Sequence, residues 1–332
     1  MSSIYDIAKL TGFSSTTVAR ALANRGYCKP QTRAIIEEAA RKLNYTPNLS
    51  AKTLRNNKTQ RILLCIPDIC NPFYFRVIQG ASNILEKHNY YVMLCSTEKE
   101  LEKEMKMLSL LQQKYCDGVI LISFDFSEKN ISKIREIGRP VILGNRYLDQ
   151  RDDDPFDYVY VDHVYGMELA TSHLLDKGCK NVLLMTGNRE EQTSRERIGG
   201  FMRAMQSHGL EVDENYIVDC HYTMQGGYDA LMQFLARKLP VDGVIAANDL
   251  AAYGVLRGCG ELGLSVPKDF RLVSFDNTDY ALVSSPTLTS VDMCQYRLGE
   301  DLALRLLERI EGNTQIRNVT LLPTLIERDS SR

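Results

Sequence analysis

Most of the chain carries its apolar residues in ten short runs, each long enough for one strand. The runs are RILLCI, YYVMLC, DGVILIS, PVILGN, YVYVD, NVLLMTG, YIVDC, DGVIAAND, RLVSFD and LTSVD. Most are separated by stretches with helical spacing, such as the one in which Leu101, Met105, Leu108 and Leu111 fall roughly on one face. Continuous apolar strands that alternate with helices indicate parallel sheets covered on both faces. Because ten strands are many for one sheet, the pattern predicts two doubly wound α/β subdomains.

The first 47 residues have a different pattern, which predicts three short amphipathic helices. Ser3 (with Asp6) and Ser14 can cap the first two helices, the second of which should run to about Asn24, and Gly12 permits the turn between them. A third helix should start at Pro30. The apolar positions expected to face inward are Ile4, Ile7, Ala8, Val18, Ala21, Leu22, Ile35, Ile36, Ala39, Ala40 and Leu43. Two short helices joined by a glycine-containing turn and covered by a third indicate a helix-turn-helix domain.

Charge is distributed unevenly between this head and the rest of the chain. Residues 1–61 hold 11 Lys and Arg against three Asp and Glu, whereas the remainder holds 29 against 39. A basic head on an acidic body indicates that the head meets a polyanion. At the start of the second helix, Ser15 and Thr16 are small enough to approach base edges, and Arg20 can reach a guanine or a phosphate.

Composition excludes several other classes of protein. The nine cysteines include no C-x-x-C pair, and the five histidines have no spacing typical of metal ligands. No apolar run approaches the roughly 20 residues of a membrane span. The N-terminus, MSSIYDIAKL, lacks the cationic and apolar regions of a secretory signal. We therefore expect a cytoplasmic protein with reduced thiols and without a metal, a cofactor or a membrane partner.

One motif suggests a nucleotide but lies in the wrong context. GCGELG, from Gly258 to Gly263, matches the dinucleotide-binding pattern G-x-G-x-x-G, which must follow a strand and open a helix. Here it comes late in a helical pattern, so Gly263 is expected to end that helix. The chain also has no G-x-S-x-G, Walker loop or H-E-x-x-H. We predict no catalytic residue and no enzyme activity.

Polar and aromatic residues gather where the apolar runs end. The polar ones are Asp68, Ser123, Asn145, Arg146, Asp162, Asn248, Asp249, Asp276 and Asn277, and the aromatic ones nearby are Phe73, Tyr74, Phe124 and Tyr222. Open α/β sheets bind ligands at the carboxyl ends of their strands. Carboxylates, amides, an arginine and aromatic faces together suit a polyhydroxylated ring, because each hydroxyl both donates and accepts.

The head resembles that of the lactose-repressor (LacI/GalR) family. The resemblance rests on IYDIAKLTGFSSTTVARAL, on Thr32-Arg33 and on LNYTPNLSAKTLR. It implies that the second helix reads the major groove and that a hinge helix orders on operator DNA, with a leucine wedged into the minor groove. The residues it assigns to DNA are Ser15, Thr16, Thr17, Arg20, Asn24, Tyr45, Asn48, Ala51 and Leu54. Ala19 departs from the usual serine, which removes one possible phosphate contact.

The body is similar to the same family in segments such as PDICNPFYFRVIQGAS, SRERIGGFMRAM and VIAANDLAAYGVL. The resemblance implies that Arg197 and Asp276 hold a small-molecule effector. Arg197 would do so through its two-pronged guanidinium, while Asp276 would accept hydroxyl protons. The full set expected at the effector is Phe73, Tyr74, Ser123, Asn145, Arg146, Asp162, Arg197, Tyr222, Asn248 and Asp276. His163 and Cys179 stand where asparagine and histidine are usual, and His163 could alter the rim of the pocket.

These observations predict a periplasmic-binding-protein-like core behind a helix-turn-helix head. The expected divisions are 1–47 for the head, 48–60 for the hinge helix and linker, 61–161 with 294–321 for one subdomain, and 162–293 with 322–332 for the other. The expected function is a transcriptional repressor that binds a palindromic operator as a homodimer, since no heptad tail follows the core, and that is controlled by a sugar or sugar derivative in the cleft.

Three alternatives come from other classes of protein. A solute-binding protein for transport is disfavoured by the basic head and the missing signal, and a sugar-modifying enzyme by the lack of a nucleophile or phosphate loop. A regulator whose core binds a protein corepressor in place of a metabolite is weakened, but not excluded, by the match of Arg197 and Asp276 to effector positions.

Overall fold

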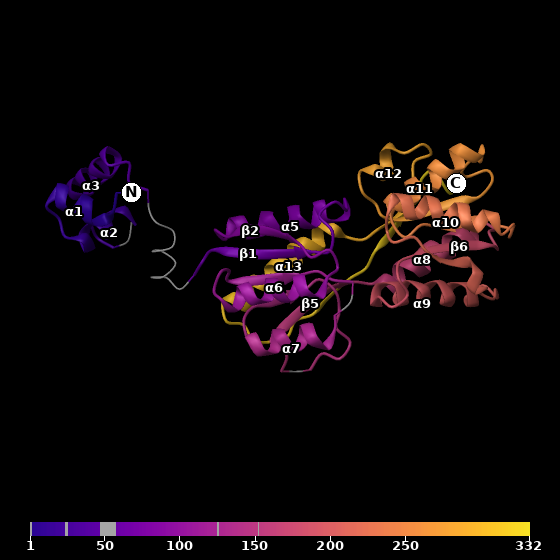
Figure 1. Cartoon of the computed structure of the whole chain (residues 1–332), viewed down its shortest axis with the longest axis horizontal. Coiled ribbons are helices and arrows are strands. Elements are labelled where there is room, and N and C mark those ends of the chain that lie inside the picture. Colours follow the sequence, from indigo (N-terminus) through magenta and orange to yellow (C-terminus); the bar gives the residue numbers. More distant parts are fainter. Residues whose placement is uncertain (1, 24–25, 47–57, 125, 152) are drawn as a thin grey trace. The chain divides into compact units, whose positions relative to one another are not determined.

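The computed structural model of the chain describes residues 2–23, 26–46, 58–124, 126–151 and 153–332. It forms two compact units, residues 1–59 and residues 60–332. Figure 1 follows the chain through the helices of the first unit and the alternating strands and helices of the second. None of the described helices has the length and apolar composition needed to span a bilayer.

The first unit contains the three predicted helices, α1 (Ile4–Thr11), α2 (Ser15–Leu22) and α3 (Pro30–Lys42). The Ser3–Asp6 capping box is present, Ser14 caps α2, and Pro30 takes the first position of α3. Gly12, with φ of 73°, ends α1 in the left-handed conformation that glycine adopts without strain. The fully or nearly buried residues of the unit are Ile7, Val18, Ala21, Ile36, Ala39 and Ala40.

Two details of the head differ from the prediction. Helix α2 ends at Leu22, and Asn24 lies outside the described residues. Ile35 was expected to face inward but is 50% exposed. The reason is geometric: Ile36, Ala39 and Leu43 follow the helical spacing of one stripe, and Ile35 is rotated by about 100° away from that stripe.

The second unit contains two parallel sheets, which we call the first and second sheets. The first has the order β11-β5-β4-β3-β1-β2. Its strands are β1 (Arg61–Ile66), β2 (Tyr91–Ser96), β3 (Gly118–Leu121), β4 (Val141–Leu143), β5 (Phe156–Val161) and β11 (Val319–Leu321). The second has the order β12-β10-β9-β8-β6-β7, and only its pairing of β10 with β12 is antiparallel among the described strands. Its strands are β6 (Val182–Thr186), β7 (Ile217–Asp219), β8 (Gly243–Ile245), β9 (Arg271–Asp276), β10 (Thr289–Asp292) and β12 (Thr324–Ile326).

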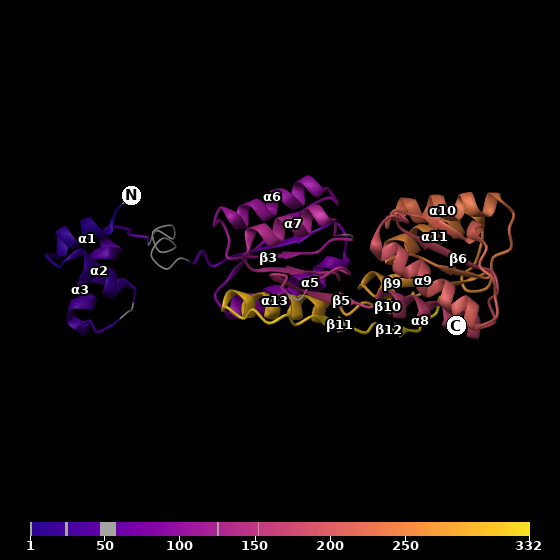
Figure 2. The same cartoon turned by 90° about the horizontal axis from the view of Figure 1, so that it is seen from below.

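Helices cover both faces of each sheet, as the continuous apolar strands require. Figure 2 shows α6 (Leu101–Gln112) and α7 (Glu128–Ile137) on one face of the first sheet, and α5 (Phe73–Lys87) and α13 (Gln295–Ile310) on the other. The second sheet lies between the pair α8 (His163–Asp176) and α9 (Gln192–Ser207) and the pair α10 (Met224–Ala236) and α11 (Asp249–Leu262). A 3-10 turn, η1 (Glu214–Tyr216), and the short α12 (Tyr280–Val283) complete the unit.

The ten apolar runs all form strands, β1 to β10, which confirms the predicted pair of doubly wound subdomains. The sequence pattern did not indicate β11 and β12, which are three residues long and join one to each sheet. The chain therefore passes between the two lobes three times, after β5, after β10 and after β11. Gly263 ends α11 with φ of 70°, so the GCGELG motif closes a helix as expected.

Helices α5 and α13 approach so closely that glycine is required at their contact. A Cβ atom on Gly80 would lie 2.1 Å from the Tyr296 carbonyl oxygen, and one on Gly299 would lie 2.0 Å from the Val77 carbonyl oxygen. Both obstacles are backbone atoms, which cannot move aside as a flexible side chain could. The α5–α13 contact therefore depends on the absence of side chains at these two positions.

Substituting Gly80→Ala or Gly299→Ala is expected to lower the free energy of unfolding by about 2–3 kcal/mol, because the helices must separate. Urea unfolding followed by circular dichroism measures the change. The matched control is Gly260→Ala on α11, where a Cβ would meet no atom within 4 Å. That control should be neutral or stabilise by up to about 1 kcal/mol. Equal stability of Gly80→Ala and the unaltered protein would contradict the close approach.

Candidate functional site

A cavity lies between the two lobes of the second unit. In doubly wound sheets the crevice forms where the strand order reverses, and here that is between β1 and β3 and between β6 and β8. The residues that line it follow those strands, together with β4, β5, β7, β9 and β10. They are Asn71, Phe73, Tyr74, Ile122, Ser123, Phe124, Gly144, Asn145, Val161, His163, Thr193, Arg197, Tyr222, Ala247, Asn248, Asp276, Met293 and Leu298.

Arg197 places a guanidinium group in the wall of this cavity. Its side chain lies on α9 and is 5% exposed, with Nη1 donating to the Ala247 carbonyl oxygen at 2.6 Å. The group packs 4.4 Å from the centre of the Phe275 ring, which fixes its plane. Its Nε is buried and has no hydrogen-bond partner. A ligand oxygen at this position would satisfy a donor that the protein leaves free.

Asp276 contributes a carboxyl group to the same cavity. Its pKa is raised to about 8, chiefly by burial and also by the charge on Asp249, while Arg197 acts in the opposite direction. The carboxyl group of Asp276 is therefore mostly protonated at neutral pH. It can donate to, or accept from, a hydroxyl group of a ligand.

The backbone that presents Asp276 is strained. Asp276 and Asn277 both have positive φ angles, 97° and 50°, which cost of the order of 1–3 kcal/mol each for residues other than glycine. Several contacts hold this turn: Gln295 Nε2 donates to the Asp276 carbonyl oxygen, and Arg328 Nη2 donates to Asn277 Oδ1 at 2.6 Å. Strain that the surroundings maintain at a cavity wall is typical of a binding site.

An aromatic pair closes one side of the cavity. The rings of Phe124 and Tyr222, one from each lobe, stack with centres 5.1 Å apart and an angle of 28° between planes. Lys99 Nζ lies 4.2 Å from the centre of the Phe124 ring and also pairs with Glu191 at 3.2 Å. Burial raises the pKa of Tyr222 to about 12, so its hydroxyl stays protonated and hydrogen-bonds with Ser194 Oγ at 3.1 Å.

His163 also lines the cavity, and its imidazole is neutral. Burial, followed by the positive charges of Arg197 and Arg146, holds the pKa of His163 well below its usual value. Its Nδ1 is buried and has no hydrogen-bond partner. Two residues that line the cavity therefore each hold a buried nitrogen without a hydrogen-bond partner, His163 Nδ1 and Arg197 Nε.

The first unit presents a second candidate site on α2. Thr16 and Arg20 are exposed, whereas Ser15 and Thr17 are partly buried. The Thr17 hydroxyl lies 2.9 Å from Ser14 Oγ and so belongs to the cap of the helix. Of the residues expected to contact DNA, Thr16 and Arg20 are thus the most accessible on this helix.

Tyr45 packs partly buried against the core of the head, and its backbone N–H donates to the Ala40 carbonyl oxygen at 2.9 Å. It supports the three-helix core as well as being a candidate for DNA contact. Asn24, Asn48, Ala51 and Leu54 lie outside the described residues, so their assignment to DNA stays a prediction.

Two family models match the two units. Residues 3–48 match the model of bacterial regulatory proteins of the lacI family, and residues 59–328 match the model of periplasmic binding proteins and the sugar-binding domain of the LacI family. The chain belongs to the LacI family. The resemblance seen in the sequence is thereby confirmed, and the protein is a DNA-binding transcriptional regulator.

Individual LacI-family relatives match over nearly the whole chain. The NTD biosynthesis operon regulator NtdR of Bacillus subtilis is 31% identical over 333 residues, covering 100% of both chains. Catabolite control protein A of Priestia megaterium is 31% identical, covering 98% of this chain and 97% of its own.

Solved structures of LacI-like regulators are also similar to the chain. The transcriptional regulator CelR in complex with cellobiose has a TM-score of 0.76 at 26% identity and full coverage of both chains. A LacI-family regulator from Enterococcus faecium with bound ribose has a TM-score of 0.72 at 28% identity, covering 82% of this chain and 98% of that one.

In this LacI-family core, eight of the ten residues expected at the effector line the cavity: Phe73, Tyr74, Ser123, Asn145, Arg197, Tyr222, Asn248 and Asp276. Asn248 also has structural bonds, since its Nδ2 donates to the Tyr222 carbonyl oxygen at 3.0 Å and its Oδ1 caps α11. Asn145 reaches across the cleft, with Nδ2 donating to Thr193 Oγ1 at 3.2 Å.

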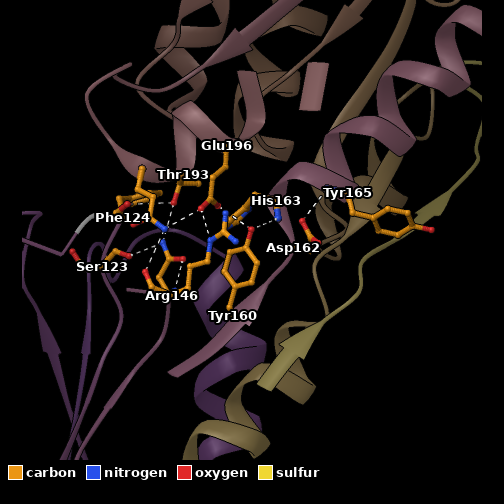
Figure 3. A network of polar contacts seen from close by, with 11 residues as sticks. Ser123, Phe124, Arg146, Tyr160, Asp162, His163, Tyr165, Thr193 and Glu196 are labelled. Atoms are coloured by element: carbon orange, nitrogen blue, oxygen red, sulfur yellow. Dashed lines mark hydrogen bonds and ion pairs between the residues drawn. The ribbon is translucent and has the colours of Figure 1, made fainter. Parts of the chain in front are cut away.

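The other two expected residues, Arg146 and Asp162, lie elsewhere. Arg146 Nε donates to Glu196 at 2.8 Å, and Asp162 Oδ1 accepts the backbone N–H of Tyr165 at 3.0 Å as the cap of α8 (Figure 3). Both residues follow a strand of the first sheet, as the cavity residues do. Strand-end position alone therefore could not show that Arg146 forms an ion pair between the lobes or that Asp162 caps a helix.

Four polar or aromatic residues line the cavity but were not in the expected set: Asn71, Phe124, His163 and Thr193. Phe124 was named among the aromatic residues near the strand ends but was left out of the expected set, and His163 was expected only to alter the rim of the pocket. Thr193 lies at the start of α9, one turn before Arg197, and the helical spacing of four would have indicated a shared face.

Proposed function

We propose that this LacI-family protein is a repressor whose affinity for a palindromic operator is set by a sugar or sugar derivative bound between the two lobes. The observation that carries the proposal is the cavity wall, in which Arg197 and Asp276 of one lobe face aromatic and polar residues of the other. Such a wall holds a ligand only when both lobes contribute, so occupancy changes the angle between them.

The chemistry of the wall favours a polyhydroxylated ring. Asn145, Asp276 and the free Nε of Arg197 supply both donors and acceptors, which hydroxyl groups can match. The Phe124 and Phe73 rings supply apolar faces for the C–H side of a sugar. Relatives of similar fold bind cellobiose and ribose, which belong to this class of ligand.

In the proposal, the head acts through a hinge. Residues 1–47 bind a half-site with α2 in the major groove, residues 48–60 form a hinge helix and linker, and Leu54 enters the minor groove. A homodimer presents two heads to the two half-sites of the operator. Because the target is chromosomal DNA, the protein would act in the cytoplasm, at the nucleoid.

The core would bind its ligand without converting it. Residues 61–161 with 294–321 would form one lobe and residues 162–293 with 322–332 the other, so that the three crossovers act as the hinge between them. A ligand-induced change of angle can bias DNA binding only by the difference in ligand affinity between the two lobe arrangements.

Selection of binding sites from a randomised DNA library by the full chain tests the proposal. A symmetric sequence should be enriched, and its affinity should fall steeply with salt as phosphate contacts are screened. D-ribose, cellobiose and a panel of other sugars are then titrated against the selected duplex. Absence of any enriched symmetric sequence would contradict the DNA function, and sugar-independent binding would contradict the effector class.

Arg20→Ala is expected to weaken binding to the selected operator about tenfold and to relax the preference at one base pair, because a base contact by arginine discriminates by about 1–3 kcal/mol. Fluorescence anisotropy with the operator and its single-base variants measures this effect. Arg41→Ala, which removes an exposed arginine from α3, is the control and should change affinity less than about threefold without altering preference. Unaltered discrimination in Arg20→Ala would show that Arg20 reads no base.

A further inference from the structure

The carboxylate of Glu196 is surrounded by donors at the junction of the two lobes. Arg146 Nε and Gln192 Nε2 donate to its Oε1 at 2.8 and 2.9 Å, and the Tyr160 hydroxyl donates to its Oε2 at 3.0 Å (Figure 3). The Arg146 guanidinium also lies 4.6 Å from the centre of the Tyr160 ring. The Glu196 side chain is only 7% exposed. A carboxylate this deeply buried is tolerated because three donors, one of them charged, replace its water.

The donors come from both lobes. Arg146 follows β4 and Tyr160 lies in β5, both strands of the first sheet, whereas Gln192 and Glu196 lie on α9 beside the second sheet. Gln192 adds another bond across the junction by donating to the Arg146 carbonyl oxygen at 3.3 Å. The two partners of each of these interlobe hydrogen bonds are anchored to different sheets. A change in the angle between the lobes must therefore lengthen or break the bonds.

The same network meets the cavity at two points. Arg197, which lines the cavity, directly follows Glu196 on α9. His163, which also lines the cavity, donates its backbone N–H to the Tyr160 hydroxyl at 3.2 Å, and the two rings meet edge to face with centres 5.8 Å apart. A ligand that displaces α9 or the first turn of α8 therefore acts on the donors and the acceptor of this network together.

We propose that Glu196, Arg146 and Tyr160 form an interlobe clamp that holds the angle between the lobes and transmits ligand binding to it. The proposal rests on the proposed function for the identity of the signal, a sugar in the cavity. The three residues touch no ligand in this scheme: they are positioning residues that act through α9 and α8. Opening the lobes would separate Glu196 from Arg146 and Tyr160, and the cost of leaving a buried carboxylate without them makes the clamp either formed or broken.

Two conservative substitutions break the clamp in different ways. Tyr160→Phe removes the hydroxyl and keeps the ring beneath Arg146, and Glu196→Gln keeps the shape and removes the charge. Tyr165→Phe is the matched control for the first, because Tyr165 is 39% exposed and its ring points away from the network (Figure 3). Glu190→Gln is the control for the second, since Glu190 is an exposed carboxylate two residues before α9.

Hydrogen exchange of the ligand-free full chain, measured by mass spectrometry, tests the clamp without DNA or sugar. The amides of residues 144–147 and 190–197 are expected to exchange about five- to tenfold faster in both clamp variants, because local opening loses a charge-assisted hydrogen bond. The two controls should match the unaltered protein. Unchanged exchange in both clamp variants overturns the proposal, as does uniformly faster exchange throughout both sheets, which marks general destabilisation.

The second readout is coupling between the two ligands. Using the selected operator and whichever of D-ribose or cellobiose alters its binding, the ratio of operator Kd with and without sugar should move at least about threefold toward 1 in both clamp variants. A purely structural role would leave that ratio unchanged, and an unchanged ratio in both variants overturns the proposal. If neither sugar alters operator binding by the unaltered protein, the proposed effector class fails, whereas the exchange measurement still decides the clamp.

Discussion

Asp276→Asn is expected to stabilise the core more strongly as the pH rises. Relative to the unaltered protein, its gain in the free energy of unfolding should be about 4 kcal/mol larger at pH 9 than at pH 5. The cause is the buried carboxyl group, whose pKa is raised by burial to about 8 from an ordinary 3.8. At pH 9 the folded protein must hold this group as a buried anion, whereas asparagine carries no charge at any pH.

The sign follows from proton uptake on folding. Between about pH 4 and pH 8 the unfolded chain has lost the Asp276 proton and the folded chain retains it, so the unaltered protein loses stability as the pH rises through this window. The stability associated with the protonated Asp276 carboxyl group is fully present below about pH 4 and is lost above about pH 8. Asp276→Asn removes this loss and also removes an acceptor from the cavity, so the gain in stability should accompany weaker effector binding.

Urea unfolding of the full chain at pH 5, 7 and 9 measures the difference. Asp229→Asn is the control, because Asp229 is an exposed aspartate on α10, and its effect on the free energy of unfolding should stay within about 0.5 kcal/mol at every pH. A gain that is the same at pH 5 and pH 9 would show that Asp276 does not titrate in this window.

The fold could be predicted from the sequence because its signals are local. The capping box at Ser3 and the cap at Ser14 mark helix starts, and continuous apolar runs mark buried parallel strands. Strands β11 and β12 escaped prediction because neither is a buried apolar run: their residues are partly or fully exposed, and each pairs with a strand far away in the chain. Ile35 is exposed although its neighbour Ile36 is buried, so the sequence located the buried face of this helix only to within one residue.

The site was predictable in outline but not in its division of roles. Strand-end position brought Asp276 together with the aromatic residues, since parallel strands end at one edge, whereas Arg197, which lies on α9, was assigned only through the family resemblance. Strand-end position could not show that Arg146 lies outside the cavity. Arg146 is held instead by an ion pair with Glu196, which lies on a helix 50 residues further along the chain. Nor could strand-end position show that His163 Nδ1 lacks a partner, which depends on packing between the lobes.

Arg197→Leu is expected to reduce affinity for the effector about 100-fold while leaving the operator affinity of the ligand-free protein within about twofold. Arg197 is a buried cation in the cavity wall with a free Nε–H, so a bound oxygen gains a charge-assisted hydrogen bond there. Losing such a bond costs about 3 kcal/mol, and each 1.4 kcal/mol is tenfold in affinity. Leucine retains an apolar contact with Phe275, which limits the effect on folding.

Calorimetric titration with the active sugar and anisotropy with the selected operator separate the two affinities. Arg203→Ala is the control, since Arg203 lies further along α9, is largely exposed and should leave sugar affinity unchanged. If the core answers to a protein corepressor in place of a sugar, Arg197→Leu should leave regulated operator binding intact, because the substituted group lies inside the cavity and not on a protein-accessible surface. A large loss of regulation in Arg197→Leu, together with wild-type behaviour of Arg203→Ala, therefore assigns the signal to a ligand small enough to enter the cleft.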